Sequence, residues 1–213
     1  VGTALEALSL LRYMEEEVGV KNVWMTPHTM MDFNNAPSGL LLDKFDDFSA
    51  GYQGNLQLSI ASEYMLDATF DTRISQGDVL PLGKWVNQKL LLVETSDMMP
   101  QGYLDTMLEN IARSGYIPVI AHPERYLYMN ERKYPELIER GCLLQLNVPS
   151  LYGYYGDKIK KRAEKLMDEG MYQFAGFDIH RYESYAKVIQ GLKLTRKRLE
   201  RLEEILDNNN VIK

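Results

Sequence analysis

Apolar and polar residues follow two alternating patterns along the chain. Over residues 3–18 the apolar side chains recur at helical spacing, which predicts an amphipathic helix. Thr3 and Glu6 have the spacing of a capping box at the start of this helix, and Gly19 is a residue that commonly ends one. A short, mostly apolar run follows the helix, as is typical of a buried strand.

The same alternation of helical and strand-like stretches continues to the end of the chain. Strands are predicted at residues 21–26, 56–62, 89–94, 117–121, 142–147 and 172–177. Helices are predicted around residues 40–52, at 101–114, 131–140 and 156–169, and as one long helix at 182–206. Strands that alternate with helices favour βαβ units in a parallel sheet. Such a sheet either closes into a barrel with its site where the strands end, or stays open and doubly wound.

Composition limits the class of protein without indicating a function. Of 213 residues, 45% are hydrophobic and 25% are charged, and no linker or repeat divides the chain, so we predict one globular domain over residues 1–213. The formal net charge of -6, without a basic patch, argues against nucleic acid as a partner. No signal peptide or membrane-length apolar run is visible, and the single cysteine, Cys142, suits a cytoplasmic location.

All three histidines of the chain come just after short apolar runs. They are His28, His122 and His180, and two isolated carboxylates, Glu63 and Glu94, occupy the same kind of place. Surface histidines scatter over loops and helix faces, whereas metal ligands and catalytic groups gather where parallel strands end. We therefore predict that these side chains belong to one site.

Spacing favours the barrel over the doubly wound sheet. By subtraction of residue numbers, the steps from His28 to Glu63, to Glu94 and to His122 are 35, 31 and 28 residues, and the next step, to Asp178, is 56. One βα unit takes about 30 residues, so these groups mark successive strand ends, with one strand that lacks a charged ligand. A site at a switch point of an open sheet would draw on fewer strands.

Imidazoles together with carboxylates predict a divalent-metal site, for which manganese, iron and zinc are all suitable. Asp178 and His180 are two residues apart at one strand end, so both can face the same cavity. Two or three clustered ions would activate a water molecule and stabilise both the attacking and the leaving oxygen. Arg125, three residues after His122, either clamps a phosphate group or forms a salt bridge with a neighbour such as Glu124.

Two further features stay open at this point. Arg181 directly follows His180 and is a weaker candidate for the same phosphate-binding role as Arg125. The tyrosine-rich segment 151–156 comes after a predicted strand end. It either lines a pocket or forms a turn with packed aromatic rings.

The motifs that contain these residues resemble those of a known family. They are Thr26-Pro-His28, Ser62-Glu63, Val93-Glu94-Thr95, Ala121-His-Pro-Glu-Arg-Tyr126 and Asp178-Ile-His180, together with Leu146-Asn-Val-Pro-Ser150. In order and spacing, over nearly the whole chain, they are similar to the PHP family, the polymerase and histidinol phosphatase superfamily. Within it the chain most resembles the bacterial metal-dependent tyrosine-protein phosphatases of capsule and exopolysaccharide synthesis.

The resemblance implies an α/β fold, a distorted TIM-like (β/α)7 barrel, around two to three divalent ions. The ions would be manganese, with iron, zinc or magnesium as alternatives. The implied reaction is phosphotyrosine hydrolysis by metal-activated water, on the tail of a bacterial tyrosine kinase that regulates polysaccharide synthesis. Arg125 would bind the phosphate, and His122 would serve both catalysis and metal binding. The implied metal ligands are His28, Glu63, Glu94, His122, Asp178 and His180.

The chain departs from the family pattern at its start. Members of the family open with a strand that carries a His-x-His pair, whereas this sequence opens on the predicted helix at 3–18. One βα unit back from His28 falls just ahead of Val1, and the six predicted strands are one fewer than the resemblance implies. We therefore expect a first strand with His-x-His ligands ahead of Val1, without which the metal site is incomplete.

Three other functions stay open. A small-molecule phosphatase, such as one for histidinol phosphate, uses the same chemistry, but it needs long loops to enclose its substrate, and the loops here look short. A metal-dependent amidohydrolase with a carbamylated lysine is disfavoured because no lysine stands at these strand ends. A non-catalytic kinase-binding protein with an incomplete metal site is disfavoured by the six ligand candidates.

Overall fold

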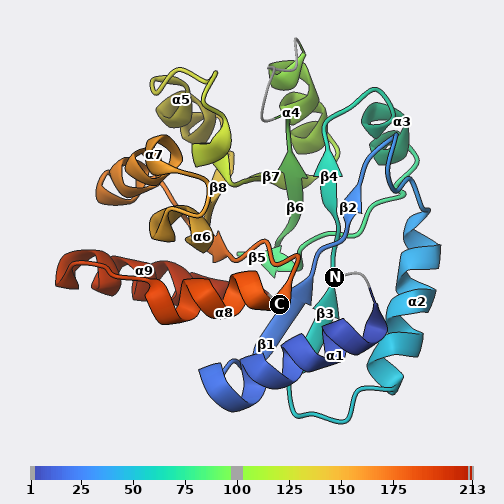
Figure 1. The fold of residues 1–213 in the computed structure, drawn as a ribbon. Coiled ribbons are helices and arrows are strands. Elements are labelled where there is room, and N and C mark those ends of the chain that lie inside the picture. Colours follow the sequence, from blue (N-terminus) through green and yellow to red (C-terminus); the bar gives the residue numbers. More distant parts are fainter. Residues whose placement is uncertain (1–2, 97–102, 211, 213) are drawn as a thin grey trace.

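The computed structural model describes residues 3–96, 103–210 and 212, which form a curled parallel sheet with helices around its outer face (Figure 1). None of the described helices has the length and apolar character that a membrane span requires. The strands are β1 (Asn22–Met25), β2 (His28–Thr29), β3 (Gln57–Ile60), β4 (Glu63–Met65), β5 (Lys84–Trp85), β6 (Gln88–Glu94), β7 (Tyr116–Ala121), β8 (Leu143–Asn147) and β9 (Phe174–Gly176). The helices are α1 (Ala4–Tyr13), α2 (Ser38–Ala50), α3 (Phe70–Ser75), α4 (Leu104–Arg113), α5 (Lys133–Glu139), α6 (Val148–Tyr152), α7 (Asp157–Asp168), α8 (Tyr182–Gly191) and α9 (Arg196–Asn209), with the π-helical turn η1 (Met14–Val18) and the 3-10 turn η2 (Pro123–Arg125).

Six strands form a parallel sheet in the order β2-β4-β6-β7-β8-β9, and β5 adds an antiparallel hairpin to β6. β1 and β3 pair in parallel just before β2 and β4, and the backbone N–H of Glu63 donates to the carbonyl of Pro27 between the two pairs. Within the described residues, β2 and β9 each have one neighbour in this sheet. The fold is therefore a mixed α/β half-barrel, which agrees with the predicted barrel only in part.

The most apolar predicted strand, β6, lies inside the sheet with both faces buried. Leu91 and Val93 point into the larger apolar cluster, which includes side chains of α4 on the outer face. Leu90 and Leu92 point the other way, into a smaller cluster with Phe174. Successive side chains of a strand alternate between the two faces, so a strand buried on both sides is apolar throughout. The run of apolar residues therefore results from its central position.

The prediction for the first helix is confirmed in detail. The Thr3 side chain accepts a hydrogen bond from the backbone N–H of Glu6, and the Glu6 carboxylate accepts one from the backbone N–H of Thr3, which completes the capping box. The last turn widens to the π-helical η1, and Gly19 follows it with a φ of 78°. A left-handed backbone conformation of this kind favours glycine because it has no Cβ.

Two predicted elements are wrong in their extent. The strand expected at 56–62 is two short strands, β3 and β4, and the second reaches Met65. The single helix expected at 182–206 is broken into α8 and α9, because Leu192 is extended with a ψ of 120° and the Thr195 side chain caps α9 by accepting from the N–H of Arg198. The first two residues of the helix expected at 101–114 lie outside the described residues, and the rest of it forms α4.

Helix α3, which the sequence did not predict, carries a buried cation. Arg73 is 8% exposed. Its Nη1 lies 2.6 Å from Asp78 Oδ2, and its Nη2 donates to Asn35 Oδ1 at 2.7 Å. The guanidinium also donates to the carbonyl of Ala36, so one side chain ties the loop before α2 to the end of α3.

We expect Arg73→Ala to lower the free energy of unfolding by about 3 kcal/mol, because it leaves a partly buried carboxylate and several carbonyl groups without their donor. Arg113→Ala is the matched control. The Arg113 side chain is 71% exposed in its ion pair with Glu109, and its loss should change stability by less than about 0.5 kcal/mol. Urea unfolding of both variants measures the difference, and equal losses would contradict the assigned role of Arg73.

Candidate metal centre

Four of the predicted ligands meet where β2, β4, β6 and β7 lie side by side. His28 and Glu63 are register partners on β2 and β4, Glu94 is the last residue of β6, and His122 follows β7 directly. His28 and Glu63 come three residues after β1 and β3, as expected from the apolar runs, and each also begins a further short strand, β2 and β4. Pro27 cannot donate a backbone hydrogen bond, so β1 ends before it and a separate short strand begins at His28.

Two buried carboxylates stand between two imidazoles in this cluster. His28 Nδ1 lies 2.9 Å from Glu94 Oε1 and 3.4 Å from Glu63 Oε2. His122 Nε2 lies 2.9 Å from Glu63 Oε1 and 3.5 Å from Glu94 Oε2. The two glutamates are only 5% and 6% exposed, and buried carboxylates require cationic partners.

The two predicted ligands beyond β9 approach the cluster from its other side. His180 Nε2 lies 3.2 Å from His28 Nε2, and His180 Nδ1 lies 2.9 Å from the backbone carbonyl oxygen of Asp178. Ligand atoms of His28, Asp178 and His180 all lie within 4.8 Å of one another, and the same holds for His28, Glu63 and Glu94. His28 is thus common to two sets of potential metal ligands.

Two of these residues have backbone conformations that non-glycine residues rarely adopt. The φ angles of His122 and Asp178 are 37° and 46°. The backbone N–H of His122 donates to the carbonyl of Gln145 on β8, which anchors the turn before η2. Left-handed backbone at a non-glycine residue costs about 1–2 kcal/mol and is commonly found at functional sites. The conformation at His122 turns the chain sharply, so that η2 lies over the end of the sheet.

The carboxylates and the imidazoles change each other's pKa. Burial lowers the pKa of His122, but hydrogen bonds with Glu63 and Glu94 outweigh it and raise that pKa to about 10. The hydrogen bond with Glu94 is the main cause that raises the pKa of His28. Burial raises the pKa of Glu94, but hydrogen bonds with His122 and His28 lower it to about 2. Without a metal ion, a proton on His122 therefore offsets part of the buried negative charge.

The donor set fits a divalent cation. It combines imidazole nitrogens with carboxylate oxygens, which suit manganese, iron and zinc. Among the described residues, His122 Nδ1 is buried and has no hydrogen-bond partner. A buried nitrogen without a hydrogen-bond partner calls for an explanation, and an ion bound nearby is one possible explanation.

A metal ion has to compete with protons for these histidines. An imidazole ligand must be neutral, whereas the pKa of about 10 keeps His122 protonated at neutral pH, and the pKa of His28 is raised as well. We therefore expect manganese binding to release about one or more protons per ion near pH 7, and affinity to rise with pH. Calorimetric titration in two buffers of different ionisation enthalpy measures this release, and identical heats in both buffers would contradict it.

Arg125 is paired with a predicted ligand rather than with its sequence neighbour. Its Nη1 lies 3.0 Å from Asp178 Oδ2, and its Cζ lies 5.0 Å from the centre of the Tyr155 ring. Glu124 is fully buried and accepts hydrogen bonds from the backbone N–H of Asn147 and from the Tyr172 hydroxyl. Burial raises the pKa of Glu124. The guanidinium thus lies at the edge of the ligand cluster.

Two residues of the site, Asn147 and Tyr155, were not named as site residues, although Tyr155 belongs to segment 151–156, which was expected to line a pocket or to form a turn with packed aromatic rings, and Tyr154 and Tyr155 of that segment do both. Asn147 ends β8, the strand without a charged ligand, and its Nδ2 lies 3.3 Å from the Tyr155 hydroxyl and 3.5 Å from Asp178 Oδ2. Its place at the end of the predicted strand 142–147 was the signal that could have identified it. Nothing in the sequence indicated that Tyr155 would lie against Arg125.

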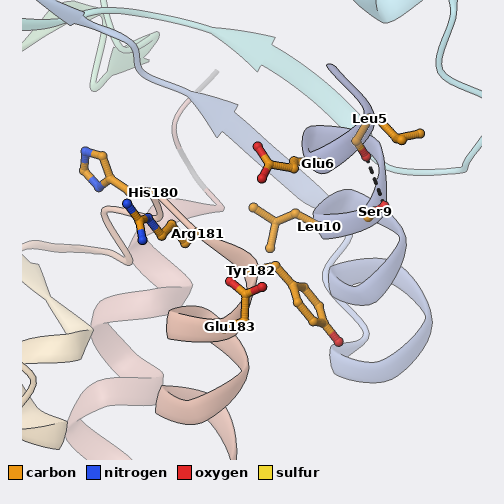
Figure 2. Close-up of a pocket in the computed structure, with 8 residues that line it drawn as sticks. All are labelled: Leu5, Glu6, Ser9, Leu10, His180, Arg181, Tyr182 and Glu183. Carbon is orange, nitrogen blue, oxygen red and sulfur yellow. Dashed lines mark hydrogen bonds between the residues drawn. The ribbon is translucent and has the colours of Figure 1, made fainter. Parts of the chain in front are cut away.

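Arg181 lines two pockets together with His180. Figure 2 shows His180 and Arg181 on the opposite side of a pocket of about 240 Å³ from helix α1. Glu6 and Ser9 of α1 line the opposite wall. Arg181 is exposed. The second pocket is also lined by Tyr155, whose ring lies against Arg125.

A parallel half-barrel with buried imidazoles and carboxylates where its strands meet defines an α/β protein with a strand-end site suited to divalent ions. The chain matches the family model for capsular polysaccharide synthesis, CpsB/CapC, over residues 3–211. It therefore belongs to the CpsB/CapC family.

Individual relatives agree with this assignment. The chain is 26% identical to CapC of Staphylococcus aureus over 215 residues, which cover 97% of this chain and 83% of the relative. It is 27% identical over 184 residues to the tyrosine-protein phosphatase CpsB of Streptococcus pneumoniae, with 81% and 74% covered. These relatives confirm the resemblance to the bacterial tyrosine-protein phosphatases.

A solved structure shows the same fold. It comes from work on YwqE of Bacillus subtilis and CpsB of Streptococcus pneumoniae, described as metal-dependent tyrosine phosphatases. The TM-score is 0.67 at 20% sequence identity, over 98% of this chain and 89% of the solved chain. At this identity the match concerns the fold alone.

Proposed function

We propose that this protein is a metal-dependent protein-tyrosine phosphatase that acts on the phosphotyrosine tail of a bacterial tyrosine kinase in capsule or exopolysaccharide synthesis. One observation carries the proposal: Arg125 lies 3.0 Å from Asp178 at the edge of a buried cluster of imidazoles and carboxylates. A fixed guanidinium beside a cation site is an arrangement that binds phosphate. The names and the family of the relatives support it.

Each residue has a proposed role. When bound, two to three divalent ions, preferably manganese, would activate water and offset the charge of the phosphate. Arg125 would place its planar fork on the phosphate oxygens and orient the ester. Asp178 holds the guanidinium in position before substrate arrives. The proposed metal ligands are His28, Glu63, Glu94, His122, Asp178 and His180.

The proposal also concerns the complete fold and the cellular location of the protein. We propose that residues 1–213 belong to one domain and that its curled sheet is part of a distorted (β/α)7 barrel. The parallel order of the six strands from β2 to β9 supports this. A cytoplasmic location is supported by the single, unpaired Cys142.

Phosphate release tests the proposal. The manganese-loaded protein should release phosphate from a tyrosine-phosphorylated kinase-tail peptide, and a chelator should stop the release until manganese is restored. Histidinol phosphate serves as the comparison substrate, because a small-molecule phosphatase would prefer it. Release that chelators leave unchanged would contradict the metal-dependent mechanism.

A further inference from the structure

An aromatic pocket adjoins the candidate metal centre. It has a volume of about 100 Å³ and lies between the segment after α6 and helix α8, with Asp178 and His180 at its edge. Its polar lining combines these two predicted ligands with Arg181 and Ser184, while most of its wall is apolar. Side chains in that wall include Pro149, Tyr154, Tyr155, Phe177, Tyr185 and Val188.

Tyr155 connects this pocket to Arg125. The Arg125 guanidinium lies over its ring at 5.0 Å, and its hydroxyl lies 3.5 Å from Asp178 Oδ2. Asn147 Nδ2 donates to the same hydroxyl at 3.3 Å. Both ends of the side chain are thus held, and Tyr155 lines the pocket while its ring also contacts Arg125, the group proposed to bind phosphate.

Tyr154 forms the outer part of the wall. Its ring meets that of Tyr155 edge to face, with centres 5.0 Å apart and planes at 79°. Its hydroxyl lies 3.2 Å from Ser184 Oγ on α8, and its backbone N–H donates to the carbonyl of Pro149. Gly153 precedes it with a φ of 92°, a conformation that favours glycine and turns the chain after α6. The ring is 51% exposed although it is held in this way.

We propose that this pocket binds the phenyl ring of the substrate while Arg125 holds its phosphate, so that the site selects aryl over alkyl phosphate esters. The proposal rests on the proposed phosphatase function and adds the source of its specificity. The pocket of about 100 Å³ is smaller than the closed cavity of about 150 Å³ that holds a benzene molecule, so we expect a ring to enter it in part and to stay partly exposed at its open side. The edge-to-face rings of Tyr154 and Tyr155 suit the phenyl group of the substrate, and the Arg125 guanidinium suits its phosphate.

The test compares two phosphate monoesters, one with an aromatic ring next to the phosphate and one without. With the manganese-loaded full chain, we expect kcat/KM for a phosphotyrosine peptide to exceed that for the matched phosphoserine peptide. We expect Tyr155→Leu and Tyr154→Leu each to reduce this ratio about fivefold, the scale of one lost aromatic contact. Tyr155→Phe keeps the ring and should keep the ratio, even where it slows both reactions through Asp178.

Tyr152→Leu is the matched control, because Tyr152 belongs to the same segment but is not part of the pocket wall. Its ratio should equal that of the wild type. Calorimetry with phenylphosphonate and methylphosphonate gives a readout without turnover, in which the preference for the phenyl compound should disappear in Tyr155→Leu.

The outcomes separate this proposal from the proposed function. An active wild type whose aryl-to-alkyl ratio is unchanged by both leucine variants would overturn the pocket assignment and leave the phosphatase in place. A wild type that hydrolyses neither peptide would overturn the phosphatase function. The phosphonate affinities would then still decide whether the pocket binds a ring.

Discussion

His122→Ala should lower kcat/KM of the manganese-loaded protein for a phosphotyrosine peptide by about 10³-fold, because metal ions supply several kcal/mol of transition-state stabilisation. His122 Nε2 stands 2.9 Å from Glu63 and 3.5 Å from Glu94, and the imidazole is only 3% exposed. Its removal takes away a proposed ligand and the imidazole that contacts both buried carboxylates. Steady-state kinetics at saturating manganese measures the loss.

Metal affinity tests the same variant independently of turnover. We expect manganese to bind His122→Ala about 10- to 100-fold more weakly, the range found when groups around a metal are lost. His122→Asn serves as the matched control for folding, since it keeps a polar group beside Glu63 without an imidazole. It should recover stability in urea unfolding but not activity. The role of His122 would be contradicted if both variants bound manganese as tightly as the wild type and kept kcat/KM within tenfold of the wild-type value.

Arg125→Ala should lower kcat/KM by about 10²- to 10³-fold, as expected when one donor to a charged transition state is removed. The guanidinium is aligned by Asp178 at 3.0 Å, so its fork is in place before the phosphate binds. Unlike His122→Ala, this variant should bind manganese at least as tightly as the wild type, because Asp178 loses a competing cation. The combination of lost activity and retained metal binding distinguishes a phosphate-binding residue from a metal ligand.

Arg125→Lys keeps the charge but not the planar fork, so it should recover only part of the activity. Arg113→Ala, which removes another ion-paired arginine, should leave kcat/KM unchanged, because that side chain is 71% exposed and pairs with Glu109 on α4. Inhibition by inorganic phosphate gives a second measure, and it should weaken in Arg125→Ala. Unchanged phosphate inhibition in that variant would show that the guanidinium does not contact the phosphate.

Local patterns in the sequence were sufficient for the central strands and their ends. The apolar runs of β6 and β7 are buried on both faces, so the first charged or polar residue after each run marks the rim of the sheet. Glu94 and His122 were placed in this way. The helix break near Leu192 was not, because a single cap at Thr195 outweighs a helical pattern that continues on both sides of it.

Contacts between distant segments were beyond the reach of sequence. Spacing allowed Arg125 to pair with Glu124, but the left-handed turn at His122 buries Glu124 and directs Arg125 to Asp178. The contact between Tyr155 and Arg125 could not be predicted either, because Tyr155 follows β8 whereas Arg125 follows β7.

By itself, the sequence determined the alternation of strands and helices, the family, and the residue types available for a metal site, since each of these depends on local pattern and spacing. The tertiary structure decided which of those residues face one another. His28 and His180 are 152 positions apart, yet their ring nitrogens lie 3.2 Å apart. Only the curl of the sheet brings them together, because curvature depends on how all the strands pack and not on any one of them.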